Sequence, residues 1–347
     1  MRVALLESVV LDLTGCSYNK TDRIDQPARS RAFPVSRLLR PLIHRRTLEN
    51  ITERVMIHPA TEMTKKVGRH RLWMWCAAGL LVVLAGCSLT LTYRYADWII
   101  LWQVDHYFDL TADQRHDVAE RLTPLLALHR HEAIPQYEAF LVQVLQRFER
   151  GLTSQDIDWA YATFDRLRAD LFDRVAVDGG VLLASVDPRQ VRIFEAALQK
   201  DDDKAVRLVQ APVPERLKKR AQTTIDWLED GLGSLSKDQE AQIREWSLAL
   251  PDMQQVSFTY RQLLQQELLV LLHQPRTPER VAGELRAMFV SLDQHAPQDY
   301  RDAVRQMRAA VKIMALAIDQ RLTHDQRHHA VTKLQRLIDQ LHDLQVE

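Results

Sequence analysis

The segment Leu110-Thr111-Ala112-Asp113-Gln114 recurs in outline along the chain and decides how it folds. The other occurrences are Leu152-Thr153-Ser154-Gln155-Asp156, Val186-Asp187-Pro188-Arg189-Gln190, Leu235-Ser236-Lys237-Asp238-Gln239 and Leu322-Thr323-His324-Asp325-Gln326, with Thr277-Pro278-Glu279 as a looser relative. In each, a Ser, Thr or Asp side chain can accept a hydrogen bond from a free N–H of a helix's first turn. The residue three positions later can return a bond to the cap. These capping boxes predict a protein of many helices.

Between the boxes, apolar residues recur at intervals of three and four, which is typical of amphipathic helices. Examples are Ile243/Trp246/Leu250, Leu285/Met288/Phe289/Leu292 and Val331/Leu334/Leu337/Ile338/Leu341. We expect helices to stop at Gly151, Gly179-Gly180, Gly231, Pro251 and Pro275, where this periodicity lapses. We expect a charged surface connection over 200–220. The pattern predicts an all-α bundle of about eight to ten amphipathic helices.

The composition agrees with this fold class and narrows the function. Only 10 of the 347 residues are Gly, which disfavours a turn-rich β-sandwich or barrel. Three cysteines, Cys16, Cys76 and Cys87, are too few for a disulfide framework. The 46 Lys and Arg residues balance 46 Asp and Glu residues, so the charge does not indicate a nucleic-acid partner.

Residues 63–86 have the parts of a bacterial lipoprotein signal peptide. A basic stretch with Lys65, Lys66, Arg69 and Arg71 precedes an apolar run over 72–83, and Leu84-Ala85-Gly86-Cys87 then forms a lipobox. The Cys87 thiol is the nucleophile that would accept a diacylglyceryl group. Leu84, Ala85 and Gly86 would be recognised by the signal peptidase. The alternative, a membrane-spanning helix, is disfavoured because the apolar run is shorter than the ~20 residues that a crossing needs.

Residues 1–62 precede this signal, although export signals are read from the start of a chain. We predict that translation begins at Met63 and that 1–62 is an over-extended gene start. The alternative is a genuine, irregular N-terminal extension, with 72–86 as an uncleaved anchor. On the first interpretation the mature helical domain is 87–347.

The residue after the lipobox cysteine indicates the destination. Ser88 in that position is typical of lipoproteins that reach the outer membrane and face the periplasm. The mature chain would carry 32 basic and 39 acidic residues, so we expect it to contact the membrane through acyl chains on Cys87 rather than by charge. The helix expected over 93–107 is apolar nearly all round, and we expect it to pack in the core. The alternative is an aromatic anchor at the membrane surface.

Residues with catalytic or metal-binding chemistry are few. The sequence has no Gly-rich phosphate loop, G-x-S-x-G, H-E-x-x-H or C-x-x-C motif. His324 and His328 lie four apart and could supply two metal ligands, but we favour a solvated helix start. Asp97, Asp105 and His106 could perform acid–base chemistry, although we favour caps and surface charges. The histidines in His129-Arg130-His131-Glu132 point apart on a helix. We therefore predict no cofactor.

Two segments carry a resemblance to a known family. Leu84-Ala-Gly-Cys87-Ser88 is followed by Tyr95-Ala-Asp97-Trp98-Ile-Ile-Leu101-Trp102-Gln-Val-Asp105-His-Tyr107-Phe-Asp109-Leu110-Thr111-Ala-Asp-Gln114, and Trp246-Ser-Leu-Ala-Leu250-Pro251 comes later. The chain resembles a lipoprotein family of Gram-negative bacteria known as domain of unknown function 6279. The resemblance covers essentially 87–347 and none of 1–62. It implies an all-helical lipoprotein and no assigned activity.

A second resemblance concerns the capping boxes alone. Leu-Thr-x-x-Gln at 110–114 and 322–326, with Ser at 235–239, is similar to a motif of small periplasmic helical chaperones. We therefore predict a non-enzymatic interaction, scaffold or chaperone-like module with a protein partner in the envelope. The alternative is an envelope hydrolase or metal-dependent enzyme that uses the Asp and His residues above.

Overall fold

The computed structural model describes residues 88–290 and 295–346, and all regular structure in these ranges is helical. The elements are α3 (Ser88–Arg94), α4 (Ala96–Phe108), α5 (Ala112–Leu128), η1, a π-helix (His129–Ala133), α6 (Ile134–Glu149), α7 (Ser154–Ser185), α8 (Pro188–Gln210), α9 (Val213–Leu232), α10 (Lys237–Ala249), α11 (Gln254–Leu272), α12 (Pro278–Phe289), α14 (Gln298–Asp319) and α15 (His324–Val346). Counting the continuous run of α5, η1 and α6 as one helix gives eleven helices in these ranges, slightly more than the eight to ten that the sequence predicts. The all-α prediction is confirmed.

The proposed extension, signal peptide and lipobox, including Leu84, Ala85, Gly86 and Cys87, lie outside the described residues. In the part of the chain that is described, no helix is long and apolar enough to cross a bilayer.

All five capping boxes are present, which explains why the helices begin where they do. The Thr111 hydroxyl accepts from the Gln114 backbone N–H at 3.2 Å, and the Gln114 side chain accepts from the Thr111 N–H at 3.0 Å. The same reciprocal bonds form at Thr153/Asp156, Asp187/Gln190, Ser236/Gln239 and Thr323/Gln326. At the looser relative, the Thr277 hydroxyl accepts from the Arg280 N–H at 3.3 Å.

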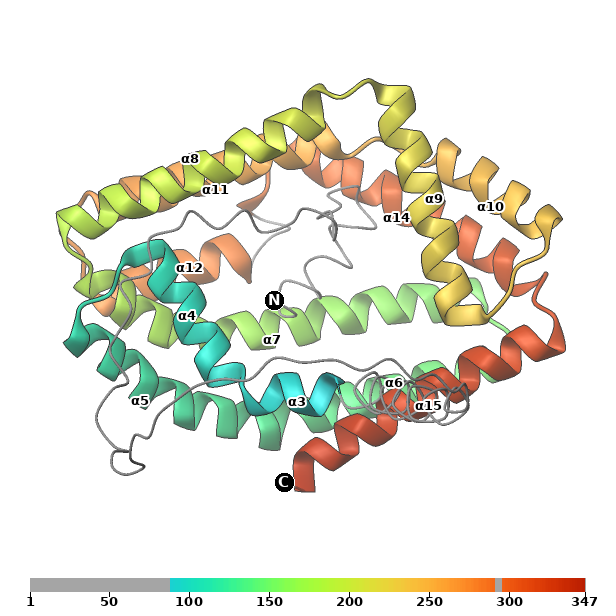
Figure 1. The fold of residues 1–347 in the computed structure, drawn as a ribbon, viewed down its shortest axis with the longest axis horizontal. Coiled ribbons are helices and arrows are strands. Elements are labelled where there is room, and N and C mark those ends of the chain that lie inside the picture. The colour runs from blue at the N-terminus through green and yellow to red at the C-terminus, as the bar shows by residue number, and fades with distance from the viewer. Residues whose placement is uncertain (1–87, 291–294, 347) are drawn as a thin grey trace, which may run out of the picture. The chain divides into compact units, whose positions relative to one another are not determined.

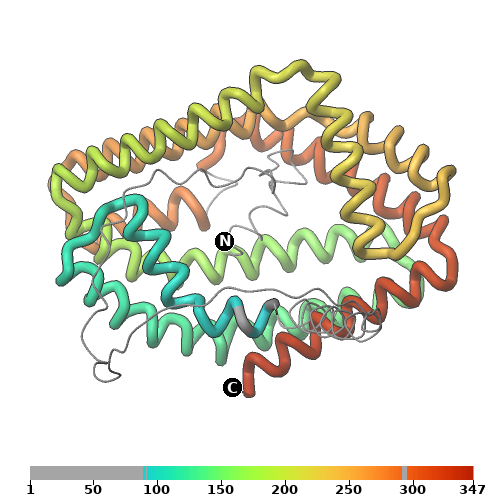
Figure 2. Tube along the Cα trace, in the orientation of Figure 1, coloured from blue at the N-terminus to red at the C-terminus, as the bar shows by residue number. Residues whose placement is uncertain are grey.

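The helices pack mainly as neighbouring pairs: α7 with α12, α6 with α15, α9 with α10, and α8 with α11 (Figure 1). The last helix, α15, returns along α6 and also contacts α3, so the first and last described helices lie together (Figure 2).

Two apolar clusters of buried residues lie between several of these helices. The larger one joins α4, α5, α7, α8, α11 and α12, and its Phe108 and Phe194 rings stack with centroids 4.7 Å apart. Leu110 and Val186, the apolar residues just before two caps, are buried in it. The smaller cluster is centred on Met253, Met307 and Met314. The boxes thus place helix starts against the core.

The prediction of a helix end at Gly179-Gly180 is wrong, because α7 runs through both residues to Ser185. A Cβ at Gly180 would lie 2.5 Å from the Pro278 carbonyl oxygen, so this glycine allows α12 to approach α7 closely. Gly231 likewise lies inside α9, which ends at Leu232 and is followed by Gly233 with a φ of +83°. Gly151, with a φ of +90°, follows the end of α6 as predicted.

The surface connection expected over 200–220 is also wrong. Helix α8 continues to Gln210, and only residues 211 and 212 separate it from α9. The carboxylate of Asp202 is almost buried and accepts from Arg261 Nη2 of α11 at 2.6 Å, and Tyr107 of α4 donates to Asp201 at 2.9 Å. The acidic run therefore bonds α8 to its neighbours.

Arginines close several helix C-termini, a feature that the sequence analysis missed. Arg220 donates to the carbonyl oxygens of Ser247 and Leu250, each at 2.7 Å, and to that of Pro251 at 2.8 Å. Arg276 donates to the carbonyls of Leu183 and Leu272 at 2.7 and 2.6 Å. These bonds satisfy carbonyls that have no partner within their own helix. Burial lowers the pKa of both guanidinium groups, which nevertheless stay charged.

Candidate functional site

The glutamines of the capping boxes pair with one another between helices. Gln114 and Gln190 exchange two amide bonds, with Nε2 to Oε1 distances of 3.0 and 2.7 Å. Gln239 and Gln326 exchange two bonds of 2.9 Å each. The starts of α5 and α8, and those of α10 and α15, therefore meet at two junctions, which we name the paired boxes.

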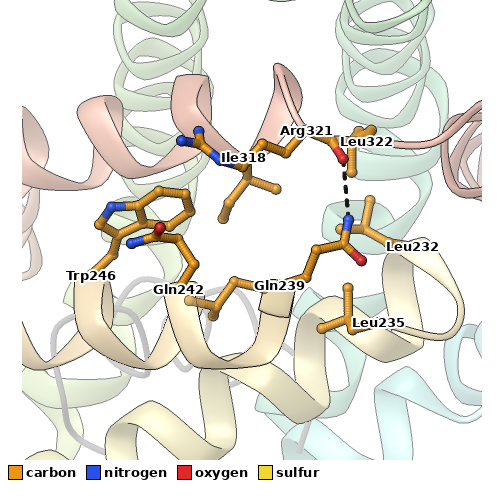
Figure 3. A pocket seen from close by; sticks show the side chains of 9 residues that line it. Leu232, Leu235, Gln239, Gln242, Trp246, Ile318, Arg321 and Leu322 are labelled. Atoms are coloured by element: carbon orange, nitrogen blue, oxygen red, sulfur yellow. Dashed lines mark hydrogen bonds between the residues drawn. The ribbon is translucent and has the colours of Figure 1, made fainter. Parts of the chain in front are cut away.

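Each glutamine also donates to the chain just before its partner's cap. Gln114 donates to the Ser185 carbonyl at 3.1 Å, and Gln190 approaches that of Asp109 at 3.4 Å. In the second junction Gln239 donates to the Arg321 carbonyl at 3.1 Å, the dashed line in Figure 3, and Gln326 donates to that of Ser234 at 2.9 Å. Every accepting residue lies two positions before a cap. Both junctions thus follow one pattern, and their amide groups are engaged within the fold.

A small cavity lies beside the second junction and is lined by Leu232, Leu235, Gln239, Gln242, Ile243, Trp246, Ile318, Arg321 and Leu322 (Figure 3). Its volume is about 10 Å³, close to the minimum for one water molecule. The cavity beside the second junction is consequently too small for a substrate, and the amide bonds of both junctions join helix starts.

Replacing Gln190 with Ala is expected to lower the free energy of unfolding by about 3 kcal/mol. The Gln190 amide is fully buried, and its loss would leave the half-buried Gln114 amide and the Asp187 backbone N–H of the α8 cap without these partners. Gln335→Ala is the matched control, because the exposed Gln335 makes only an i,i+4 bond to Asp339, worth about 0.5 kcal/mol or less. Urea titration followed by circular dichroism measures both. Equal effects would contradict the paired-box interpretation.

The short helix α3 is fastened to η1 by Tyr93. The Tyr93 hydroxyl donates to the Leu126 carbonyl at 3.0 Å and lies 3.2 Å from His129 Nδ1, and the two rings stack at 5.8 Å. Burial, aided by the positive charge of Arg174, holds the pKa of His129 below its ordinary value, so its ring is neutral at neutral pH. The prediction that His129 and His131 diverge did not identify this contact. The π-helix lies just before Pro135, which has no backbone N–H to donate to a carbonyl of the preceding turn.

The face of α4 opposite the core is exposed, contrary to the burial that we expected. Ile100, Leu101 and Val104 pack on the larger core cluster. Trp98 and Trp102, however, are 63% and 55% exposed. The all-round apolar character of this helix therefore reflects a core face and an aromatic outer face.

The structure separates the three residues proposed for acid–base chemistry. Asp97 is exposed. Asp105 accepts from the Leu110 N–H at 3.0 Å and from Arg115 Nη2 at 2.6 Å, which closes the turn between α4 and α5. The His106 ring stacks on Trp102 with centroids 6.0 Å apart. These contacts fit turn-closing and surface roles, and they give the hydrolase alternative no geometric support.

The two candidate metal ligands lie in solvent at the start of α15. The His324 side chain is fully exposed, with Asp325 Oδ1 3.7 Å from its Nδ1, and His328 is exposed as well. Within residues 88–290 and 295–346, no three His, Cys, Asp or Glu side chains are grouped as a metal site requires. The geometry does not favour His324 and His328 as ligands.

A histidine–carboxylate pair that the sequence did not indicate lies elsewhere. His295 Nε2 is 2.6 Å from Glu267 Oε2 of α11, near the rings of Tyr260 and Tyr300, which are tilted at 35° with centroids 4.3 Å apart. Burial raises the pKa of Tyr260 to about 12, with Tyr300 and Glu267 acting in the same direction, so this phenol keeps its proton and is a poor base. The 28-residue separation of the pair left no local pattern to find.

An open groove of about 790 Å³ lies between α9 and α10, lined by Val213, Pro214, Leu217, Lys218, Gln222, Arg244 and Leu248. Val213 and Leu248 are 47% and 43% exposed. Lys218 and Arg244 place positive charge at this apolar surface, and Arg244 Nη2 donates to Gln222 at 3.1 Å. An apolar groove with cationic side chains suits an amphipathic segment that carries acidic residues.

The fold and its junctions define an all-helical domain whose helix starts are joined in pairs by glutamine amides. The chain matches the Family of unknown function (DUF6279) over residues 106–301, more than half of its length, and it belongs to this family. Searches of curated proteins and of solved structures returned no match. The matched range begins after the lipobox, so membership carries no information on lipidation.

Proposed function

We propose that this chain is a lipoprotein, held by acyl chains on Cys87 at the periplasmic face of the outer membrane. Its helical part is a non-enzymatic scaffold or chaperone-like module that binds a protein partner. The lipobox at 84–87, with its basic and apolar leader and the following Ser88, supports the anchor.

The α9/α10 groove carries the binding part of the proposal. Its apolar residues are exposed on two helices that pack closely together, so the surface is presented by a formed element. Lys218 and Arg244 favour an amphipathic helix with acidic residues beside its apolar stripe. Burial of that stripe would provide the affinity, and the two cations would set its orientation.

Site-specific photo-crosslinking in intact cells tests this surface. A photoreactive amino acid at Leu248 should give an adduct with a discrete partner, whereas one at Ile313, an even more exposed apolar position on α14, should not. Reversing the groove charges with Lys218→Glu and Arg244→Glu should lower the adduct yield by about tenfold, as expected for opposed charges at an interface. Reversal at Lys200, exposed on α8 and outside the groove lining, is the matched control. Adducts of equal yield from Ile313, or adducts insensitive to charge reversal, would reject the groove.

A further inference from the structure

We propose that Tyr95, Trp98 and Trp102 form a second membrane contact, which we name the aromatic face, and that α4 lies along the lipid surface. This inference rests on the proposed anchor at Cys87 for the membrane's proximity. The occupant is the headgroup layer of the bilayer, where amphipathic aromatic rings are enriched.

The aromatic face is defined by spacing and exposure. Trp98 and Trp102 are four residues apart in α4 and share one side of that helix, and Tyr95 is the residue just before α4. Tyr95, Trp98 and Trp102 are 54%, 63% and 55% exposed. Tryptophan is usually well buried in a folded protein. Two exposed indoles one turn apart therefore indicate a surface that is covered in the protein's working environment.

The rest of α4 makes this face rigid. Phe108 is buried against Phe194, and Tyr107 bonds to Asp201 of α8, so the end of α4 is fixed to the core. At the other end, Tyr93 fastens α3 to η1, and α3 also contacts α15. A membrane contact here would therefore orient the whole helical domain rather than a loose tail.

The distance along the chain from the anchor favours this orientation. Trp98 and Trp102 follow Cys87 by eleven and fifteen residues, or ~16 and ~22 Å if the helical rise continued over the whole stretch. A headgroup layer is only about 5–8 Å thick on each side of the bilayer. If α3 and α4 both stood upright on the membrane, both indoles would lie beyond that layer. With α4 nearly parallel to the surface, both indoles can reach the layer together, because they share one side of the helix.

The charges around the aromatic face favour a contact in which its rings partition into the bilayer, rather than one that depends on electrostatic attraction. Arg94, Asp97 and His106 are exposed on the same stretch and do not form a basic patch. Such a contact should be insensitive to salt, unlike one that depends on lysine or arginine with anionic lipid.

Radical footprinting of the lipidated protein in vesicles of phosphatidylethanolamine and phosphatidylglycerol tests the proposal. Compared with the Cys87→Ala full chain free in buffer, oxidation of Trp98 and Trp102 should fall about fivefold or more, since interfacial rings lie among the headgroups. Trp227 of α9, 57% exposed, is the internal control and should change less than twofold. The protection should persist at high salt and on dilution of protein with lipid.

Unchanged oxidation of Trp98 and Trp102 would overturn the proposal. Protection that disappears on dilution would also overturn it, because a second copy of the chain, rather than lipid, would then cover the aromatic face.

Flotation with vesicles is an independent measurement. Trp98→Ser with Trp102→Ser in the Cys87→Ala chain should reduce flotation several-fold, and Trp227→Ser should not. If Cys87 is acylated but Trp98 and Trp102 are not protected from oxidation, only the aromatic face is rejected. If added vesicles protect these residues in the Cys87→Ala chain, but the wild type is not acylated, only the anchor is rejected.

Discussion

Replacing Cys87 with Ala is expected to abolish incorporation of a fatty-acid analogue into the protein and to release most of it from the membrane fraction. The thiol is the proposed attachment point for the diacylglyceryl group, and alanine has no nucleophile to accept it. Two or three acyl chains anchor a protein stably, so their loss should weaken its attachment to the membrane. Metabolic labelling followed by fractionation measures both effects.

Cys76→Ala is the matched control, because Cys76 lies in the apolar run of the same leader but outside the lipobox. Its labelling should equal that of the wild type. Label retained by Cys87→Ala would show attachment elsewhere and would contradict the predicted lipobox. The part of any membrane retention of the unlabelled Cys87→Ala chain that is lost on adding Trp98→Ser and Trp102→Ser is the contribution expected from the aromatic face.

Replacing Gly180 with Ala is expected to destabilise the fold by about 2–3 kcal/mol, although alanine is the better helix former. The new Cβ would lie 2.5 Å from the Pro278 carbonyl oxygen and 3.0 Å from the Ala282 N and Cβ atoms. These are mainly backbone atoms, so α12 would have to move away from α7. The cost of overpacking exceeds the gain of up to about 1 kcal/mol in helix propensity.

Gly283→Ala, on α12 itself, should change the stability in the opposite direction. A Cβ there meets nothing within 4 Å, so the substitution should stabilise the protein by about 0.5–1 kcal/mol. Thermal unfolding of the two variants beside the wild type is the measurement. If Gly180→Ala also raised the melting temperature, α7 and α12 would not be in the close contact described above.

The capping boxes could be predicted because a cap is a local device. The cap and the residue that answers it lie three positions apart, and both are readable in the sequence. Which boxes meet could not be predicted, since Gln114 and Gln190 are 76 residues apart and their pairing depends on the whole fold. The arginines at the helix ends could not be predicted for the same reason, because most of the carbonyls that they bind are distant in the sequence.

Glycine was the least reliable signal. Gly151 ends a helix, whereas Gly180 lies within one and serves its packing. A sequence shows that a side chain is absent but not whether the backbone turns or a neighbour approaches there. The run Asp201-Asp202-Asp203 misled for a similar reason, because Arg261, the partner that pairs with Asp202, is distant in sequence.

The candidate sites, likewise, could be predicted from the sequence only in part. Asp105 and His106 were visible as chemistry-bearing residues, but the turn-closing contacts of Asp105 became apparent only from the arrangement of α4 and α5. The α9/α10 groove left no motif, because Lys218 and Arg244 come from different helices. Trp98 and Trp102 were recognised as apolar, yet only the positions of α5 and α8 determine which side of α4 is covered.

Intact-mass spectrometry of the protein isolated from its native membrane is the most direct measurement of the proposed anchor. We predict a polypeptide that begins at Cys87 and carries the added mass of a diacylglyceryl group together with an amide-linked acyl chain. An unacylated species that still contains residues 1–62 would contradict the account.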